Sequence, residues 1–127
     1  AESFAERLHQ RIRTEFWAYQ PQENLSNEDL IAERYQGIRP APGYPACPDH
    51  AVKAAMFEVL QAQDIQMSLT ENLAMLPASA VSGFYLWRPE SQYFNLGPIG
   101  EDQLADYAQR AQVSDRDARS RLATVLG

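Results

Sequence analysis

One proline-rich loop carries the side chains best suited to hold a ligand. The segment from Arg39 to His50 reads Arg-Pro-Ala-Pro-Gly-Tyr-Pro-Ala-Cys-Pro-Asp-His and contains four prolines and one glycine. Proline fixes φ, and Gly43 permits backbone angles that other residues adopt with difficulty, so the loop is expected to be ordered before anything binds. A pre-ordered loop lowers the entropy cost of binding. The pattern predicts either a ligand loop presenting Arg39 and Tyr44 or a rigid connector between packed elements.

The same loop contains Cys47, Asp49 and His50, which are residue types that bind metals. The chain has no other cysteine, and His9 is its only other histidine, so no second ligand cluster stands at metal-site spacing. This disfavours a metal site and favours Cys47 as a small packed residue. No glycine-flanked serine and no nucleophile with a neighbouring base is visible either.

Composition narrows the class of protein further. The 127 residues are 45% hydrophobic, which is enough for one small domain, and the formal net charge is −6. Nucleic acids and anionic membranes select clustered Lys and Arg, so neither is an expected partner. A single cysteine excludes an internal disulfide, and neither a membrane-length apolar run nor a signal peptide is visible. We expect a cytoplasmic protein.

Hydrophobic periodicity predicts three helices in the first half. Residues 3–19 form an amphipathic pattern whose apolar stripe is Phe4, Leu8, Ile12, Phe16 and Trp17. Ser26 followed by Asp29 is typical of a capping box, and it predicts a second helix running to about Tyr35 and ending at Gly37. Pro48-Asp49 suits the first turn of a third helix, which reaches about Gln63 and would bury Val52, Met56, Val59 and Leu60.

The second half predicts a small sheet followed by two helices. Residues 67–77 and 81–87 lose the helical period and favour antiparallel strands, and 93–96 favours a short third strand. Leu104, Tyr107 and Ala108 mark a helix from about 101 to 111, and Ser114 with Asp117 caps a last helix ending near 126–127. The expected class is α+β, with helices packed on a small antiparallel β-meander. No repeat or linker divides residues 1–127.

Several motifs together resemble one known family. They are the runs Glu23–Glu28 and Tyr35–Ile38, the Arg39-x-x-x-Gly43-Tyr44 motif, and the runs Val81–Tyr85 and Pro89–Phe94. They are similar to the activation domain of cobalamin-dependent methionine synthase, the C-terminal module that binds S-adenosylmethionine. The resemblance covers essentially the whole chain. The family's domain is longer and the chain starts at Ala1 rather than Met, so residues 1–127 are expected to be its C-terminal part.

The resemblance implies a site for S-adenosylmethionine around Arg39. Arg39 aligns with the family's ligand-binding arginine, and a guanidinium offers a carboxylate two parallel donors that Lys cannot reproduce. Tyr93 and Phe94 align with an aromatic pair that contacts the ligand. Close relatives carry Tyr-Tyr there, so Phe94 loses a hydroxyl. The alternatives are a surface arginine paired with an acid, and ordinary strand packing for the two rings.

The resemblance implies four further residues of the site, two of them in the proline-rich loop. Glu33, expected on the helix before the loop, and Glu2 match family carboxylates near the sulfonium, where Coulomb attraction would stabilise a cation. Gly43 belongs to the loop motif, and Tyr44 matches a tyrosine that faces cobalamin. The alternatives are solvated helix charges for Glu2 and Glu33 and a packing ring for Tyr44.

The function implied by the resemblance is reductive reactivation of methionine synthase. Inactive cob(II)alamin receives an electron from flavodoxin or an equivalent reductase and a methyl group from S-adenosylmethionine, which this module presents to the cobalamin-binding domain of the same enzyme. The cofactors would be S-adenosylmethionine and a cobalamin held by that other domain, because Asp49-His50 lacks the spacing of a cobalt-ligand motif. The alternatives are a non-catalytic docking module for the cobalamin domain or flavodoxin and an independent methyltransferase. The absence of a glycine-rich strand-turn-helix counts against the latter.

Overall fold

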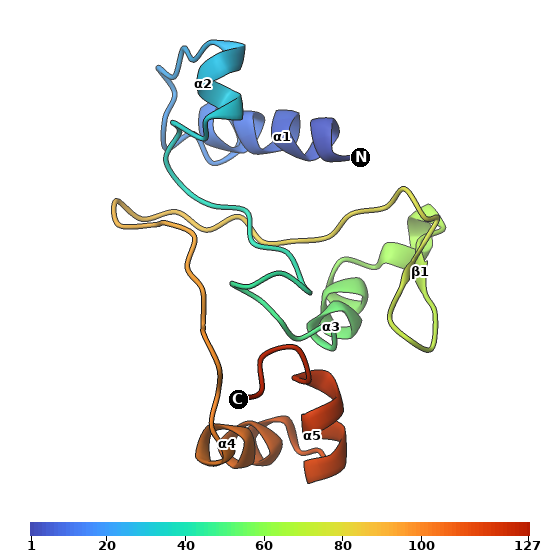
Figure 1. Ribbon diagram of the computed structural model, residues 1–127. Coiled ribbons are helices and arrows are strands. Elements are labelled where there is room, and N and C mark those ends of the chain that lie inside the picture. The colour runs from blue at the N-terminus through green and yellow to red at the C-terminus, as the bar shows by residue number, and fades with distance from the viewer.

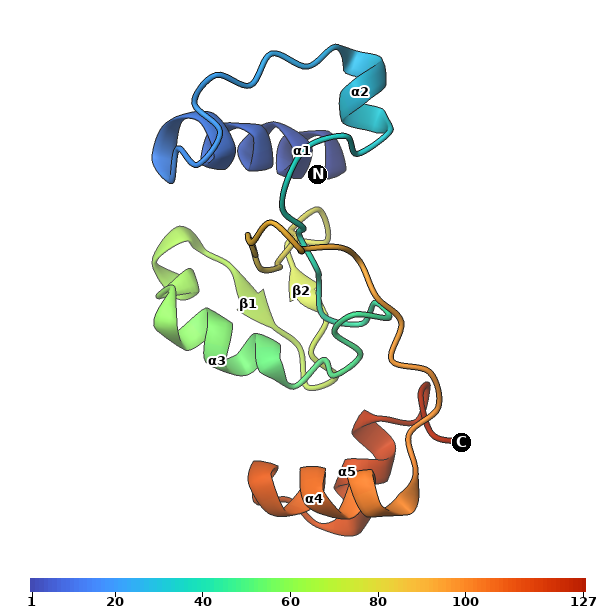
Figure 2. The ribbon, with the colours of Figure 1, turned by 90° about the vertical axis from the view of Figure 1, so that its left-hand side faces the viewer.

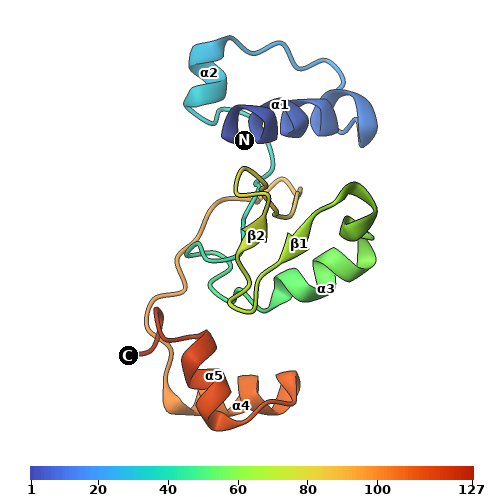
Figure 3. The same ribbon diagram turned by 90° about the vertical axis from the view of Figure 1, so that its right-hand side faces the viewer.

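The computed structural model describes residues 1–127 as three groups of elements that follow one another along the molecule (Figure 1). One end holds α1 (Glu2–Arg11), its π-helical continuation η1 (Ile12–Phe16) and α2 (Asn27–Ile31). The middle holds α3 (Val52–Val59), the 3₁₀ turn η2 (Ala62–Ile65), β1 (Ser68–Leu69) and β2 (Met75–Leu76). The other end holds α4 (Glu101–Ala111) and α5 (Asp115–Arg121). Figures 2 and 3 show the same order from two further sides.

The predicted helix caps are confirmed. The Ser26 hydroxyl accepts a hydrogen bond from the Asp29 amide at 3.1 Å, and Ser114 does the same for Asp117 at 3.1 Å. The helix ends differ from expectation, because α2 stops at Ile31 rather than near Tyr35 and α5 stops at Arg121. Short local signals define where a helix starts, whereas its end depends on contacts with the rest of the chain.

The buried face of the first helix is polar, which the sequence pattern did not indicate. His9 and Arg13 have 0% exposure, whereas Phe4, Phe16 and Trp17 of the expected apolar stripe are exposed. The reason is that distant groups, described below, accept and neutralise the polar side chains. The expected stripe of the third helix is only partly buried, since Val52 and Met56 are half-buried whereas Val59 and Leu60 are exposed. Lys53 and Phe57 are its buried residues, and Val59 is 81% exposed.

The α+β class with a small antiparallel sheet is confirmed, and both strands of the sheet lie within the expected segment 67–77. β1 and β2 form a hairpin that pairs Ser68 with Leu76 and Leu69 with Met75. The expected strands 81–87 and 93–96 do not form. Instead the start of the proline-rich loop pairs with 84–86 through an isolated antiparallel bridge between Ile38 and Leu86. Pro40 has no N–H to extend this pairing into a longer ladder.

Burial is spread over small separate clusters rather than one central core. Only 13 of the 127 residues are buried, so each group of elements is stabilised locally. At the C-terminal end, Leu104, Ala118 and Leu122 form a compact apolar cluster between α4 and α5. A parallel bridge between Ile99 and Leu126 closes that unit. None of the helices is both long enough and apolar enough to span a membrane.

Candidate functional site

The backbone around Arg39 is fixed by pairing with a segment almost fifty residues away. Ile38 and Leu86 exchange two backbone hydrogen bonds of 2.9 Å, and the Phe84 amide donates to the Pro40 carbonyl at 2.9 Å. Gly37 precedes this pairing with φ +91°, and a Cβ there would lie 2.5 Å from the Tyr19 hydroxyl. Only glycine meets both demands without strain. The Arg39 side chain therefore starts from a fixed backbone position between the N-terminal helices and residues 84–86.

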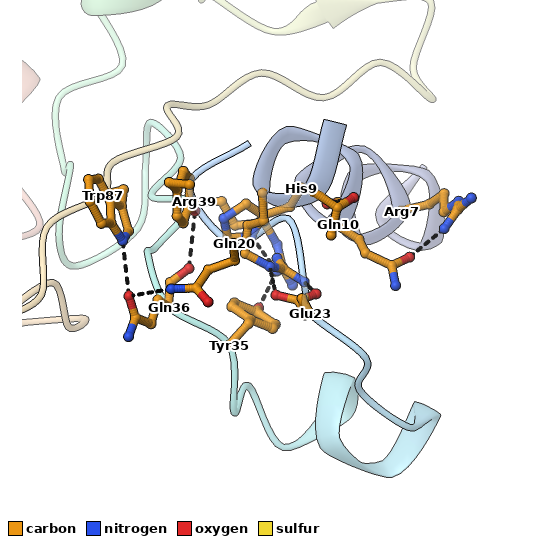
Figure 4. Close-up of polar contacts among 12 residues, drawn as sticks. Arg7, His9, Gln10, Gln20, Glu23, Tyr35, Gln36, Arg39 and Trp87 are labelled. Carbon is orange, nitrogen blue, oxygen red and sulfur yellow. Dashed lines mark hydrogen bonds and ion pairs between the residues drawn. The ribbon is translucent and has the colours of Figure 1, made fainter. Parts of the chain in front are cut away.

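The Arg39 side chain lies among three groups from α1 and the segment before the loop. Its Nη2 pairs with Glu6 Oε2 at 2.7 Å. Its Nη1 donates a short hydrogen bond to the Tyr35 hydroxyl and lies 3.4 Å from His9 Nδ1 (Figure 4). Burial lowers the pKa of the Arg39 guanidinium, but Tyr35 and Glu6 outweigh burial and raise it above its ordinary value. Arg39 is therefore a fixed, fully charged cation.

A second arginine, Arg13, contacts Tyr35 and thereby supports the surroundings of Arg39. Arg13 pairs with Glu23 through Nε at 2.6 Å and Nη2 at 2.8 Å, and both side chains are almost fully buried. The Arg13 guanidinium also lies 4.0 Å from the centre of the Tyr35 ring, within the range of a cation–π contact. Arg13 thereby ties η1 to the turn at Glu23 and to Tyr35, which in turn contacts Arg39.

The two neutral partners of Arg39 stay neutral at physiological pH. Burial, followed by the charges of Arg13 and Arg39, lowers the pKa of His9 to about 3. His9 packs between Tyr35 and Tyr85, with ring centres 5.0 and 5.1 Å away. Burial also raises the pKa of Tyr35 to about 12. Because an arginine only donates, His9 Nδ1 is the acceptor and the ring proton lies on Nε2.

Tyr93 contacts Arg39, and Phe94 lies in the wall of a cavity. The Arg39 amide donates a hydrogen bond to the Tyr93 hydroxyl at 3.0 Å. Phe94 lines an open cavity of about 550 Å³ whose other walls include Trp17, Ile38, Tyr85 and Trp87. This volume is in the range of small-molecule sites, and aromatic walls suit a planar base. Arg39 and Tyr93 do not line this cavity, but their sequence neighbours Ile38 and Phe94 do.

The aromatic wall of the cavity is itself held in place. Trp87 stacks on Tyr19 with ring centres 4.7 Å apart, and Trp17 meets both rings edge-on. Gln36 Oε1 accepts hydrogen bonds from Trp87 Nε1 at 3.2 Å and from Gln20 at 3.0 Å (Figure 4). These contacts join the end of the first helix, the segment before the loop and residue 87.

Gly43 and Tyr44 form a tight turn at some distance along the loop from Arg39. The Gly43 amide donates to the Cys47 carbonyl at 2.8 Å, and the Cys47 amide donates to Tyr44 at 2.8 Å. Gly43 has φ +96°, and a Cβ there would lie 2.2 Å from the His50 ring. Tyr44 is 62% exposed. The turn thus requires glycine and presents the Tyr44 ring to solvent.

The two carboxylates expected near the sulfonium have separate surroundings. Glu33 does not lie on a helix, which corrects the prediction. It follows the end of α2 with φ +53° and is exposed. Its charge reaches Tyr35, whose pKa it helps to raise. Glu2 is the first residue of α1 and is also exposed. The structure therefore joins Arg39 to Tyr93 by a hydrogen bond, whereas Glu2, Glu33 and Tyr44, like Phe94, are exposed.

Sequence reasoning missed Glu6, His9 and Arg13, which all contact the site. Their spacing of three and four residues places them on one face of the first helix. Hydrophobic periodicity indicated only the apolar stripe of this helix. A polar row of acid, histidine and arginine at helical spacing was the available signal, but recognising it required the partners Glu23 and Tyr35.

A second, smaller cavity of about 300 Å³ lies away from this site, between the end of the loop and α4 and α5. Its walls include Pro48 and Leu122. There the Tyr107 hydroxyl donates to Asp49 Oδ2 at 2.6 Å. Asp49 also accepts a hydrogen bond from the Ala51 amide at 2.7 Å. Asp49 therefore has a structural role that joins the loop to the C-terminal helices.

Comparison with known proteins agrees with this geometry. Residues 1–112 match the family model described as the activation domain of vitamin B12 dependent methionine synthase. The chain therefore belongs to the family of methionine synthase activation domains. A crystal structure of a MetH reactivation domain bound to AdoHcy superposes with a TM-score of 0.95 at 52% sequence identity. That match covers 100% of this chain and 39% of the other, so this chain spans about two fifths of the relative.

Proposed function

We propose that this chain provides the S-adenosylmethionine site for reductive reactivation of a cobalamin-dependent methionine synthase. The observation that carries the proposal is the full-length match, at 52% identity, to a reactivation domain crystallised with AdoHcy. AdoHcy shares the adenosine and amino-acid parts of S-adenosylmethionine and lacks only the transferred methyl group. A site that binds one of these ligands is therefore expected to bind the other.

The residues around Arg39 fit such a ligand. In the proposal Arg39 binds the α-carboxylate, and Tyr93 lies beside it through the hydrogen bond to the Arg39 amide. The adenine occupies the aromatic cavity that Phe94 and Trp87 line. The exposed carboxylates Glu33 and Glu2 act at longer range on the sulfonium, in a chain whose net charge of −6 already favours a cation.

The chemical contribution of the chain in this reaction is positioning. When bound, cobalamin supplies the nucleophile that accepts the methyl group. A rigid loop and a pre-placed cation would hold the methyl donor in one orientation, which lowers the entropic part of the barrier. Tyr44, exposed at the turn of the loop, would face the cobalamin-binding domain of the same enzyme. Flavodoxin or an equivalent cytoplasmic reductase would supply the electron.

The test is isothermal titration of the unchanged chain with S-adenosylmethionine and, separately, with AdoHcy. We expect saturable binding of both and tighter binding of S-adenosylmethionine, because the sulfonium adds a positive charge that AdoHcy lacks. Raising the salt concentration should shrink this preference, since the carboxylates at the site are exposed. Heats that never saturate with either ligand would contradict the proposal.

A second candidate function is supported by exposed apolar side chains around α3 and η2. Val59, Leu60 and Ile65 are between 70% and 81% exposed and lie close together in sequence. Apolar groups gathered in this way are typical of protein contacts. In this alternative the chain is a docking module for the cobalamin-binding domain or flavodoxin and holds no ligand itself. It predicts association with one of those proteins, weakened by Leu60→Ser, together with a failed ligand titration.

A further inference from the structure

Three acceptors occupy the terminal nitrogens of Arg39. Nη2 pairs with Glu6, while Nη1 meets Tyr35 and His9. A guanidinium has five N–H groups, and these contacts involve only the two terminal nitrogens, so the Nε–H has no partner in the chain. Nε and Nη2 share one edge of the planar group, and an edge with two parallel N–H groups is what a carboxylate binds. The contacts that Tyr35, His9 and Glu6 make with Nη1 and Nη2 thus leave the Nε side of Arg39 open to a ligand.

We propose that Glu6, assisted by Tyr35 and His9, is a positioning residue that orients Arg39 so that its Nε/Nη2 edge faces the carboxylate of the ligand. This inference rests on the proposed function and specifies how its carboxylate subsite is built. Glu6 acts through Arg39 and does not itself contact the ligand. It is the only charged member of the three and therefore makes the strongest contact.

The three partners are rigid enough for this role. His9 is fully buried, and Tyr35 is 9% exposed beneath the Arg13 guanidinium. Glu6 lies on α1 three residues before His9, so one helix carries both groups. Its side chain is 26% exposed and that of Arg39 is 25% exposed, so the pair is shielded from solvent more than a surface ion pair. Holding a long arginine side chain before the ligand arrives reduces the rotamer freedom lost on binding.

A direct role for Glu6 makes a different prediction. As an anion near the ligand, Glu6 could attract the sulfonium or the ammonium group directly. That attraction would act on every ligand carrying those cations. A positioning role acts only on ligands that carry the carboxylate. Decarboxylated S-adenosylmethionine, which keeps the sulfonium, the adenosine and the amine, separates the two roles.

The experiment is calorimetric titration of the unchanged chain, Glu6→Ala and Glu6→Gln with both ligands. We expect Glu6→Ala to weaken S-adenosylmethionine binding about tenfold, the effect of losing one charge-assisted contact. Glu6→Gln should remain within about threefold of the unchanged chain, because its amide oxygen still accepts from Nη2. All three proteins should bind the decarboxylated ligand equally. Tyr35→Phe removes one acceptor with little change of shape and should weaken S-adenosylmethionine alone, which keeps the test available if Glu6→Ala unfolds.

Each contrary result has a defined meaning. Equal weakening of both ligands in Glu6→Ala overturns the positioning role and makes Glu6 a direct ligand contact. Unaltered S-adenosylmethionine affinity in Glu6→Ala shows that Arg39 needs no such support and also overturns it. Failure of the unchanged chain to bind S-adenosylmethionine removes the proposed function, and the inference with it. The first two results leave the proposed function standing.

Discussion

Different kinds of interaction stabilise the N-terminal and the C-terminal end of this molecule. At the N-terminal end, the fully buried side chains are His9 and Arg13, and Arg13 is neutralised by Glu23. At the C-terminal end, Leu104, Ala118 and Leu122 form an apolar cluster. The polar end depends on exact partners, because a buried charge without its counter-ion is strongly destabilising. The apolar end depends on filled volume.

This difference matches the proposed division of roles. The polar end holds Arg39, which pairs with Glu6, and its neighbour Ile38 lines an aromatic cavity. The apolar end closes on itself and touches the loop through Tyr107 and Asp49. A site for a charged ligand needs fixed charges, and fixed charges need a network that satisfies them.

The largest effect is expected from breaking the buried ion pair. Arg13→Ala leaves Glu23 buried without a counter-ion and removes the contact beneath Tyr35. We expect the free energy of unfolding to fall by about 3–5 kcal/mol. Urea unfolding followed by circular dichroism measures it.

The control is an exposed arginine of the C-terminal end. Arg110 pairs with Asp106 at 2.7 Å, but both side chains are largely exposed. Arg110→Ala should change the free energy of unfolding by less than about 1 kcal/mol. If the two alanine variants lost the same stability, the contrast between buried and exposed ion pairs would be wrong.

A cavity at the apolar end should have a somewhat smaller effect. Leu104 has 0% exposure, and Leu104→Ala is expected to cost about 2–4 kcal/mol through lost burial and the cavity left behind. Because the proposed ligand site around Arg39 lies outside this apolar cluster, S-adenosylmethionine affinity of the folded variant should stay within about twofold. Hydrogen exchange should show α4 and α5 losing protection first. A large loss of affinity in the folded variant would show that the ends are coupled.

The smallest effect concerns pH and is confined to the polar end. His9 has a pKa of about 3 in the folded chain and about 6.5 when unfolded, so only the unfolded state takes up a proton between these values. Stability should therefore fall as pH drops below 6.5, approaching about 1.4 kcal/mol per pH unit for this one group.

Urea unfolding at several values between pH 7 and pH 5 measures this slope. His9→Gln should flatten it. An equally steep pH dependence in His9→Gln would mean that other groups control acid stability.

The sequence predicted the C-terminal end better than the N-terminal end for a physical reason. The bounds of α4 and the cap at Ser114 follow from neighbouring residues and were correct. The burial of Arg13 depends on Glu23 and Tyr35, and the path of residues 84–86 depends on Ile38 and Pro40. Such pairings between distant segments produce no hydrophobic periodicity in the sequence. The left-handed conformation of Glu33 was missed as well.

The site was predicted in outline because its elements are motif residues. The prediction that Arg39, Tyr93 and Phe94 share a site came from the resemblance, and the hydrogen bond from the Arg39 amide to Tyr93 agrees with it. The supporting residues Glu6 and His9 lie outside the motif. Finding them required the three-dimensional position of α1.

The most direct test of the account is the affinity of Arg39→Ala for S-adenosylmethionine, measured by isothermal titration beside Arg34→Ala. Arg34 is an exposed arginine five residues away that pairs with Asp29. If Arg39 binds the ligand carboxylate, Arg39→Ala should weaken binding about 10- to 100-fold, while Arg34→Ala keeps the affinity of the unchanged chain. Equal affinities of Arg39→Ala and the unchanged chain would contradict the central claim that the loop presents Arg39 to the ligand.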